Sequence, residues 1–144
     1  MGVLNRVRLA TMADLDFVSQ DAHPPRPDVI ERKIAFREIF IVERNGDRVG
    51  YARIEYLWSY IPCLSAIWIL EPYRRQGAGK AILSFIEKIL HDDNHEWLYS
   101  STHINEKPPQ NWHRHMGFEE CGFIAAVNED GMGEMFFRKH LTQS

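Results

Sequence analysis

The sequence contains only two cysteines, Cys63 and Cys121, among its 144 residues. Two thiols do not make the framework of a small disulfide-stabilised protein, and without a CxxC pair they indicate no metal or redox site. Long apolar runs are also missing. No stretch reaches the roughly 18 apolar residues of a membrane span, and the first residues lack the apolar segment of a signal peptide. We therefore expect a cytoplasmic protein that does not enter a membrane.

The chain also lacks an excess of positive charge. Its 17 basic and 20 acidic residues give a net charge of -3 at pH 7. Because a nucleic-acid-binding domain normally has a net basic face, this balance argues against a nucleic-acid partner. The histidines show no HExxH or similar spacing, so no metal site is predicted. No repeat or low-complexity segment is present, and the length fits a single domain over residues 1–144.

The pattern of apolar residues predicts a mixed α/β domain. Strands are expected at 3–9, 38–44, 47–58, 63–70, 96–101, 118–127 and 133–141, and helices at 12–20, 29–36, 79–91 and 108–117. Asn45-Gly46 predicts a tight hairpin turn between the second and third strands. The helix over 79–91 carries apolar residues at i, i+3, i+4, i+7 and i+8 from Ile82, the most regular amphipathic pattern in the chain.

Glycine is sparse, with nine residues in all, yet two of them stand in the stretch QGAGKA, residues 76–81. Gly77 and Gly79 fall between a predicted strand and the amphipathic helix. The first N–H groups of a helix have no intrahelical partner, and glycines let an oxygen anion approach them closely. The same pattern also suits a plain tight turn.

Two familiar phosphate loops are excluded by position. A Walker A loop, GxxxxGK[ST], would need its first glycine where Arg74 stands and a hydroxyl where Ala81 stands. The dinucleotide fingerprint GxGxxG would begin at Gly77 and needs a glycine at Ile82. Neither an NTPase nor a nicotinamide enzyme is therefore supported.

Two segments together resemble the GNAT acetyltransferase superfamily. ILEPYRRQGAGKAIL, residues 69–83, is similar to the family's acyl-CoA-binding motif [RQ]-x-x-G-x-[GA], which Arg74, Gly77 and Gly79 satisfy. NWHRHMGF, residues 111–118, resembles the family's late helix, which usually carries a tyrosine four residues before a Gly-Phe pair. The order of predicted elements also matches, so the resemblance covers essentially the whole chain.

The resemblance implies a twisted mixed sheet of about six to seven strands, flanked by about four helices and opened between the fourth and fifth strands. Acetyl-CoA is the implied co-substrate. Its pantetheine arm would lie in the opening and its pyrophosphate on the N–H groups of the glycine loop. The implied cofactor-binding residues are Ile69, Leu70, Arg74, Arg75, Gln76, Gly77, Ala78, Gly79, Lys80 and Asn105.

Acetyl transfer to an amine needs a polarised carbonyl, a neutral amine and a leaving thiolate. A main-chain N–H near Leu70 is expected to polarise the carbonyl. His113 stands at the position where the family carries the tyrosine that protonates the leaving CoA. It serves either as the general acid in place of that tyrosine, or only as a cofactor contact or a solvated residue. The fourth strand has no acid, so Glu55, His103 or a water relay is the candidate base.

Two groups of residues are candidates for the acceptor side. The aromatic residues, a type that more often packs in the core, are Trp58, Tyr60, Trp68 and Trp112. The residues around the HPPRPD loop, which otherwise belong to a plain surface loop, are Asp21, His23 and Arg26.

The predicted function is transfer of an acetyl group from acetyl-CoA to a primary amine of an unidentified small molecule or protein, by direct attack in a ternary complex. The alternative is a non-catalytic acyl-CoA-binding or interaction module on the same fold, because the strand acid and the tyrosine are missing. A homodimer is left open.

Overall fold

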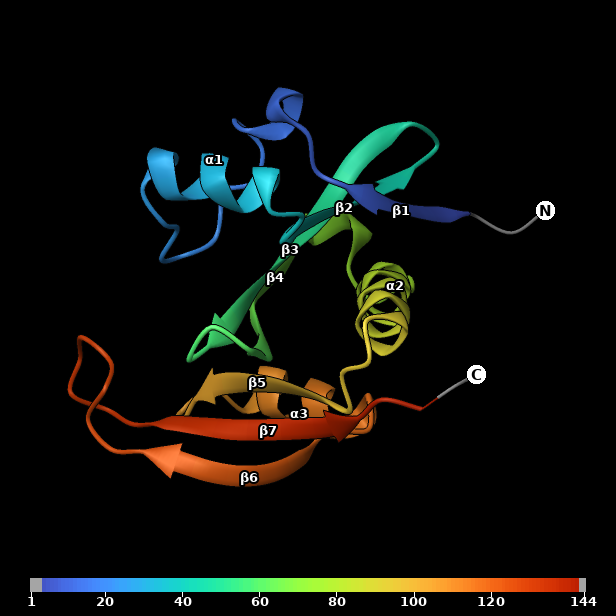
Figure 1. The fold of residues 1–144 in the computed structure, drawn as a ribbon. Helices are drawn as coiled ribbons and strands as arrows, with labels where there is room; N and C mark the ends of the chain where they lie inside the picture. Colours follow the sequence, from blue (N-terminus) through green and yellow to red (C-terminus); the bar gives the residue numbers. More distant parts are fainter. Residues whose placement is uncertain (1–3, 143–144) are drawn as a thin grey trace. The chain divides into compact units, whose positions relative to one another are not determined.

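The computed structural model describes residues 4–142, so Val3, the start of the first predicted strand, lies outside it. The elements are β1 (Asn5–Leu9), η1 (Met12–Asp14), α1 (Pro27–Ala35), β2 (Ile39–Arg44), β3 (Asp47–Leu57), β4 (Ile61–Ile69), η2 (Glu71–Tyr73), α2 (Ala78–Asp92), β5 (Trp97–His103), α3 (Lys107–His115), β6 (Glu119–Ile124) and β7 (Glu134–His140). The strands are hydrogen-bonded in the order β1-β2-β3-β4-β5-β7-β6 (Figure 1).

The sheet is mixed, as predicted. β1 with β2, β2 with β3, β5 with β7 and β6 with β7 pair antiparallel, whereas β4 pairs with β5 in parallel through Cys63 with Tyr99 and Leu64 with Ser100. The expected opening between these two strands stays a prediction. By contacts the chain divides into two compact units, residues up to Ile54 with Ala66–Ile86, and Glu55–Ser65 with the residues from Glu87 onward.

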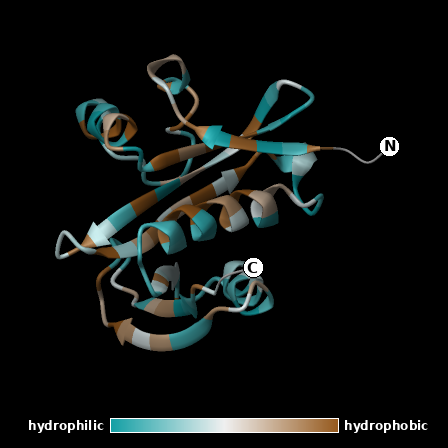
Figure 2. Ribbon diagram, turned by 45° about the vertical axis from the view of Figure 1, so that its right-hand side comes forward, coloured by the Kyte–Doolittle hydropathy of each residue, from teal (hydrophilic) through white to brown (hydrophobic). Residues whose placement is uncertain are grey.

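In the first unit, α1 and α2 cover opposite faces of the strands (Figure 1). Ile30 and Ile34 of α1 belong to a core cluster with Ile39 and Ile41 of β2. Phe40 lies between those two strand residues, and successive side chains of a strand point to opposite faces. Its ring packs edge-on against Phe85 of α2, with the centroids 6.0 Å apart. Figure 2 shows hydrophobic and hydrophilic segments alternating along α2, so the predicted amphipathic helix is confirmed.

The predicted helix over 12–20 is wrong. Only Met12–Asp14 form a short 3-10 helix, and turns follow. The backbone N–H groups of Gln20 and Asp21 donate to the hydroxyl oxygen of Tyr51, at 2.9 and 2.7 Å. Because a long-range contact uses these N–H groups, they do not bond to the carbonyls that would continue a helix. The described residues therefore contain three α-helices rather than about four.

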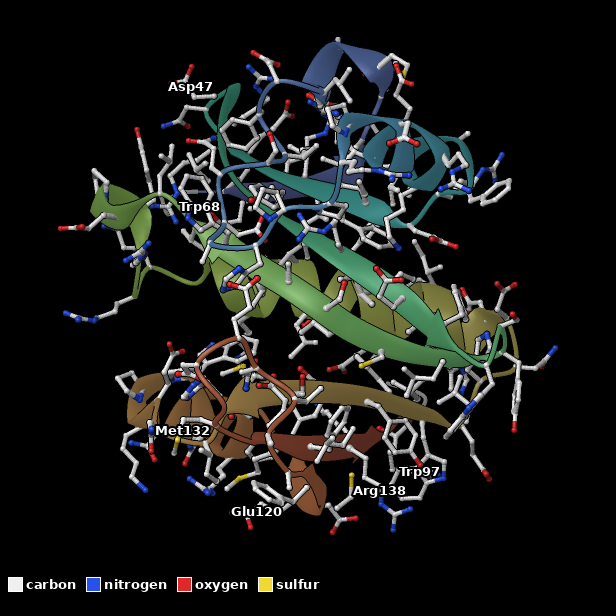
Figure 3. All side chains as sticks on the ribbon, turned by 90° about the vertical axis from the view of Figure 1, so that its left-hand side faces the viewer. Asp47, Trp68, Trp97, Glu120, Met132 and Arg138 are labelled. Atoms are coloured by element: carbon white, nitrogen blue, oxygen red, sulfur yellow. The ribbon has the colours of Figure 1, made fainter. Side chains whose placement is uncertain are left out.

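In the second unit, α3 lies against β5, which pairs with β7 (Figure 1). Leu98, Ser100 and Thr102 of β5 are buried. Trp97 of β5 lies beside Arg138 of β7, whose guanidinium carbon is 4.0 Å from the ring centroid (Figure 3).

The hairpin prediction is confirmed. Asn45 and Gly46 both have a positive φ, 53° and 86°, as a tight turn between twisted strands requires. Arg44 pairs with Asp47 directly across this turn. Within residues 4–142, no helix is long and apolar enough to cross a membrane.

Candidate active site

The glycine loop leads from η2 to the first turn of α2 in the first unit. Arg75 and Gly77 adopt positive φ values of 61° and 91°, a region that glycine enters without a Cβ clash. Gln76 and Gly77 are exposed, and α2 begins at Ala78. The first N–H groups of α2 therefore stand at an accessible helix start, where the helix dipole favours an anion. This geometry suits the expected pyrophosphate contact.

Residues outside the motif hold the loop in place. Arg44 at the end of β2 donates from Nη2 to the Gln76 carbonyl at 2.9 Å and from Nη1 to the Gln76 side-chain oxygen. Asn5 of β1 accepts from Nε and Nη2 of Arg44 at 3.1 and 2.8 Å. The ring of Tyr73 lies 5.7 Å from the Arg44 guanidinium carbon. Sequence analysis missed Arg44 and Asn5, because no local spacing links these strand residues to the loop.

The main-chain hydrogen bonds at the end of β4 decide which N–H group is available to polarise the acetyl carbonyl. The N–H of Leu70 donates to the Val49 carbonyl of β3 at 2.8 Å, so this donor is already used. In an extended strand, the N–H and C=O of successive residues point to opposite edges. The N–H of Ile69 therefore points to the edge of β4 away from β3. The Ile69 carbonyl accepts from Nε of Arg74 at 2.8 Å, which ties this part of β4 to the loop.

The apolar run CLSAIWIL, residues 63–70, is typical of a strand buried on both faces, but only part of it is buried. Pro62, Cys63 and Leu64 are buried, whereas Ala66–Ile69 and Leu70 are only half-buried. Half-buried aliphatic residues on a strand edge are suited to the apolar part of a ligand. This supports the expected contact between the main chain of residues 69–70 and a pantetheine arm.

His113 lies in the interior of the second unit with 4% of its surface exposed. Its ring stacks on Phe137 of β7, with centroids 5.0 Å apart, and meets Phe118 edge-on. Nδ1 is 2.7 Å from the Pro109 carbonyl and Nε2 is 2.6 Å from Oγ of Ser100 on β5. His113 is thus a buried, hydrogen-bonded residue and does not face solvent.

The bonds of His113 fix its tautomer. A carbonyl only accepts, so Nδ1 carries the proton and donates to Pro109. Nε2 of the neutral ring then accepts from the Ser100 hydroxyl. Burial lowers the pKa of His113, which favours this neutral form, although the Pro109 carbonyl opposes the shift. In this arrangement neither ring nitrogen is free to donate a proton to a leaving thiolate.

The two candidate bases differ in their surroundings. Glu55 of β3 is exposed. Its charge acts on the nearby thiol of Cys63, whose pKa is raised to about 12, first by burial and then by Glu55. His103 of β5 accepts from the Asn105 N–H at Nδ1, at 3.0 Å, and its Nε2 lies 2.8 Å from the Asp130 carboxylate. Both nitrogens of His103 are therefore engaged, with Asn105 and Asp130.

The structure adds one carboxylate that sequence analysis missed. Glu134 of β7 is half-buried and accepts from the Ser101 hydroxyl at 2.7 Å and from the Asn128 amide at 3.0 Å. Its charge also contributes to the raised pKa of Cys63. Its position in the last strand, without a motif around it, gave no basis for selecting it from the sequence.

The three candidate acceptor residues around the HPPRPD loop, Asp21, His23 and Arg26, differ in their partners and exposure. Asp21 forms a two-point ion pair with Arg53 of β3, at 2.9 and 2.7 Å, and accepts from the Tyr51 hydroxyl. Its carboxylate therefore anchors the loop. Arg26 pairs with Asp28 at the exposed start of α1. His23 is exposed, and its acceptor role stays a prediction.

The four aromatic candidates do not form one group. Trp58 and Tyr60 are 79% and 66% exposed at the turn between β3 and β4. Trp68, labelled in Figure 3, packs against Tyr51 in the first unit with centroids 5.5 Å apart. Trp112 meets His113 edge-on in the second unit.

The predicted site residues divide between the two units. Ile69, Leu70 and residues 74–80 lie together in the first unit, whereas Glu55, His103, Asn105 and His113 belong to the second. Asn105 is exposed in the turn between β5 and α3. The described part of the chain has no group of three or more His, Cys, Asp or Glu side chains that could hold a metal ion.

A mixed sheet with one parallel strand pair, and a glycine-containing helix start after β4, form the architecture that the sequence resemblance implied. The chain belongs to the GNAT acetyltransferases, because the family model "Acetyltransferase (GNAT) domain" matches residues 35–120. It is therefore an acyltransferase that uses acetyl-CoA as co-substrate.

The chain is similar to one curated relative in sequence and to two solved structures in fold. An N-alpha-acetyltransferase from Sulfurisphaera tokodaii is 26% identical over 148 residues, covering 88% of this chain and 87% of the relative. The ribosomal-protein-S18-alanine N-acetyltransferase of Escherichia coli has the same fold, with a TM-score of 0.80 at 18% identity over 98% and 96% of the two chains. A GNAT acetyltransferase from Elizabethkingia anophelis, solved with acetyl-CoA bound, gives 0.78 at 14% identity over 95% and 98%.

Proposed function

We propose that this acetyltransferase modifies the α-amino group at the N-terminus of a peptide or protein. The observation that carries this proposal is the similarity to the Sulfurisphaera tokodaii N-alpha-acetyltransferase, which extends over nearly the full length of both chains. The proposal narrows the primary amine expected from the sequence to one class of acceptor.

The loop in the first unit is the proposed site for the pyrophosphate of acetyl-CoA. Its N–H groups at the start of α2 and the positive φ of Gly77 suit an anion at close range. Arg74, Arg75 and Lys80 add positive charge, and Gln76, Ala78 and Gly79 complete the loop. When bound, the co-substrate supplies the thioester. Ile69 and Leu70 would contact its pantetheine arm, and Asn105 is retained as a proposed further contact.

The amine nitrogen bonds to the carbonyl carbon as the carbon–sulfur bond breaks, so the amine must lose one proton and the thiolate must gain one. We assign the N–H of Ile69 to the carbonyl oxygen, because the N–H of Leu70 is already bonded to Val49. Glu55, an exposed residue of β3, is the proposed base.

His113 can deliver a proton only through the Ser100 hydroxyl, and only when Nε2 is itself protonated. Because burial lowers the pKa of His113, this form belongs to acid pH. A thiolate whose acid has a pKa of about 8.5 leaves readily without help. We therefore propose that His113 acts as an acid only below neutral pH, and that at neutral pH it holds Ser100 in position.

The proposed acceptor is tested with purified protein, acetyl-CoA and a panel of amines. The panel contains peptides that differ in their first residue, the same peptides with a blocked α-amino group and an internal lysine, and small amines such as spermidine. We expect thiol release and a one-acetyl mass increase only with free α-amino groups. Acetylation of the small amines or of lysine side chains, with no reaction at any peptide N-terminus, would contradict the proposal.

We further propose that residues 1–144 form one catalytic domain and that the protein acts in the cytoplasm, and we leave formation of a homodimer open. Sedimentation at assay concentration decides the last point, since an active monomer makes a dimer unnecessary.

A further inference from the structure

The guanidinium of Arg44 differs from the other buried charges of the protein. The buried charged side chains among residues 4–142 are Asp14, Lys33, Arg44 and Arg53. Asp14, Lys33 and Arg53 each form an ion pair. The oxygen atoms that Arg44 contacts within the described part of the chain are neutral, and all come from Asn5 and Gln76.

A buried cation without an ion-pair partner is costly. Transfer of a charge out of water is strongly unfavourable, and neutral hydrogen bonds offset only part of that cost. Arg44 is 6% exposed and is bonded directly to the loop that precedes α2. An anion bound on the outer side of that loop would supply the missing negative charge.

The bonds of Arg44 also orient the loop. Its Nη2 donates to the carbonyl of Gln76, so this carbonyl points toward β2. In a trans peptide the C=O and the following N–H point in opposite directions, and the described residues contain no cis peptide. The N–H of Gly77 therefore points away from Arg44, on a loop whose residues 76 and 77 are exposed.

We propose that Arg44 is a positioning residue for the pyrophosphate of CoA: it turns the Gln76–Gly77 peptide so that the Gly77 N–H faces the anion, and the bound pyrophosphate balances its charge. Asn5 supports this role, because its side-chain oxygen accepts two N–H bonds from the guanidinium. The inference rests on the proposed function of the loop as the pyrophosphate site.

The test compares two ligands that differ in the phosphates. CoA carries the pyrophosphate, and pantetheine carries the same thiol arm without it. Arg44→Met removes the charge at similar length, and Asn5→Ala removes the acceptor of two guanidinium bonds. Arg6→Met is the matched control, because Arg6 is an exposed residue of the same strand as Asn5 and its loss changes the net charge equally. Calorimetry gives Kd for CoA, and NMR titration gives Kd for pantetheine.

We expect Arg44→Met to weaken CoA binding by roughly ten- to hundredfold, the range for lost hydrogen bonds to charged groups, with pantetheine affinity unchanged. Asn5→Ala should act in the same direction by a smaller factor, and Arg6→Met should change neither Kd beyond about twofold. If Arg44→Met does not fold, the Kd values of Asn5→Ala for CoA and pantetheine test the inference in its place.

Three results would overturn the inference. Unchanged CoA affinity in Arg44→Met, or in Asn5→Ala where only that variant folds, would show that the guanidinium does not matter. An equal loss for CoA and pantetheine would show a general loosening of the protein. Failure of the unmodified protein to bind CoA at all would remove the loop's proposed function, and that result is recognisable because it needs no variant.

Discussion

The hydroxyl oxygen of Ser100 lies 2.6 Å from Nε2 of His113, on neighbouring elements of the second unit. Since Nδ1 donates to the Pro109 carbonyl, the pair holds a neutral imidazole between a donor and an acceptor. A protonated ring would need the Ser100 hydroxyl to turn away, toward the Leu64 carbonyl oxygen 3.3 Å from it. One proton on His113 therefore changes the direction of a buried hydrogen bond.

His113 should make the protein less stable as the pH falls below neutrality. Its folded pKa lies below the unfolded value of about 6.5, so below that pH the unfolded chain binds more protons than the native protein. The free energy of unfolding then decreases with falling pH, by at most about 1.4 kcal/mol per pH unit for this one residue. Urea unfolding between pH 7.5 and 5 measures the slope.

The control for this prediction is His113→Phe, which keeps the ring packing against Phe118 and Phe137. Its unfolding free energy should depend less on pH in this window. Asp14 does not interfere with the measurement. Its hydrogen bonds with Arg8 lower its pKa to about 2, so its protonation changes the unfolding free energy mainly at a more acid pH than the one tested. Equal slopes for the two proteins would mean that His113 is not the responsible group.

The same variant tests the role of His113 in turnover. We expect His113→Phe to keep kcat at pH 7.5 within about threefold of the unmodified protein, because the neutral ring has no proton for the thiolate. The assay must be run where chemistry limits the rate. A hundredfold loss with intact folding would restore His113 as the general acid.

Replacing the proposed base should affect the rate and spare cofactor binding. Glu55→Gln is expected to lower kcat by roughly a hundredfold, the lower end for loss of a general base, with Kd for CoA unchanged. Glu31→Gln is the matched control, since Glu31 is an exposed acid of α1. A fully active Glu55→Gln enzyme would favour Glu134 or a water relay, and Glu134→Gln would then separate these two.

Gly77→Ala tests the close approach at the loop. At φ 91° an alanine is strained, by about 1–2 kcal/mol, and relief of that strain rotates the Gly77 N–H. We expect lower stability and lower CoA affinity together. Gly131→Ala is the control, because Gly131 has φ 81° with nothing within 4 Å of an added Cβ. It should lose similar stability and keep its CoA affinity, and a CoA Kd that is the same in both variants would argue against the loop contact.

The sequence predicted those features that depend on residues close together in the chain. Asn45-Gly46 predicted its hairpin from backbone preference alone, and the apolar spacing from Ile82 predicted α2. The prediction of a helix over 12–20 is wrong because the backbone N–H of Gln20 donates to the hydroxyl of Tyr51, 31 residues later, and not to a carbonyl of the helix. Arg44 could not be found either, since its bond to Gln76 spans 32 residues. Local patterns predict elements, whereas the groups that hold the loop depend on the pairing of strands.

The protonation of His113 shows a second limit of prediction from the sequence. The family pattern placed this residue at an acid's position, and its ordinary pKa suited that role. Its partners Ser100 and Pro109 are defined only once β5 and α3 pack together. A sequence position therefore identified the residue but not its proton.

The ion pair between Asp21 and Arg53 should contribute more to stability than to acceptor binding. Both side chains are largely buried, 17% and 4% exposed, so removal of the carboxylate leaves the Arg53 charge in the interior without it. Burial opposes ionisation of Asp21, but the hydrogen bonds from Arg53 and Tyr51 outweigh it and lower its pKa. We expect Asp21→Ala to lower the free energy of unfolding by about 3 kcal/mol.

The exposed ion pair between Arg26 and Asp28 gives the comparison. Asp28→Ala, which removes the partner of Arg26, should lower the free energy of unfolding by less than about 1 kcal/mol. If Asp21→Ala instead kept its stability and raised KM for the peptide acceptor, Asp21 would be an acceptor contact as its place in the loop first suggested.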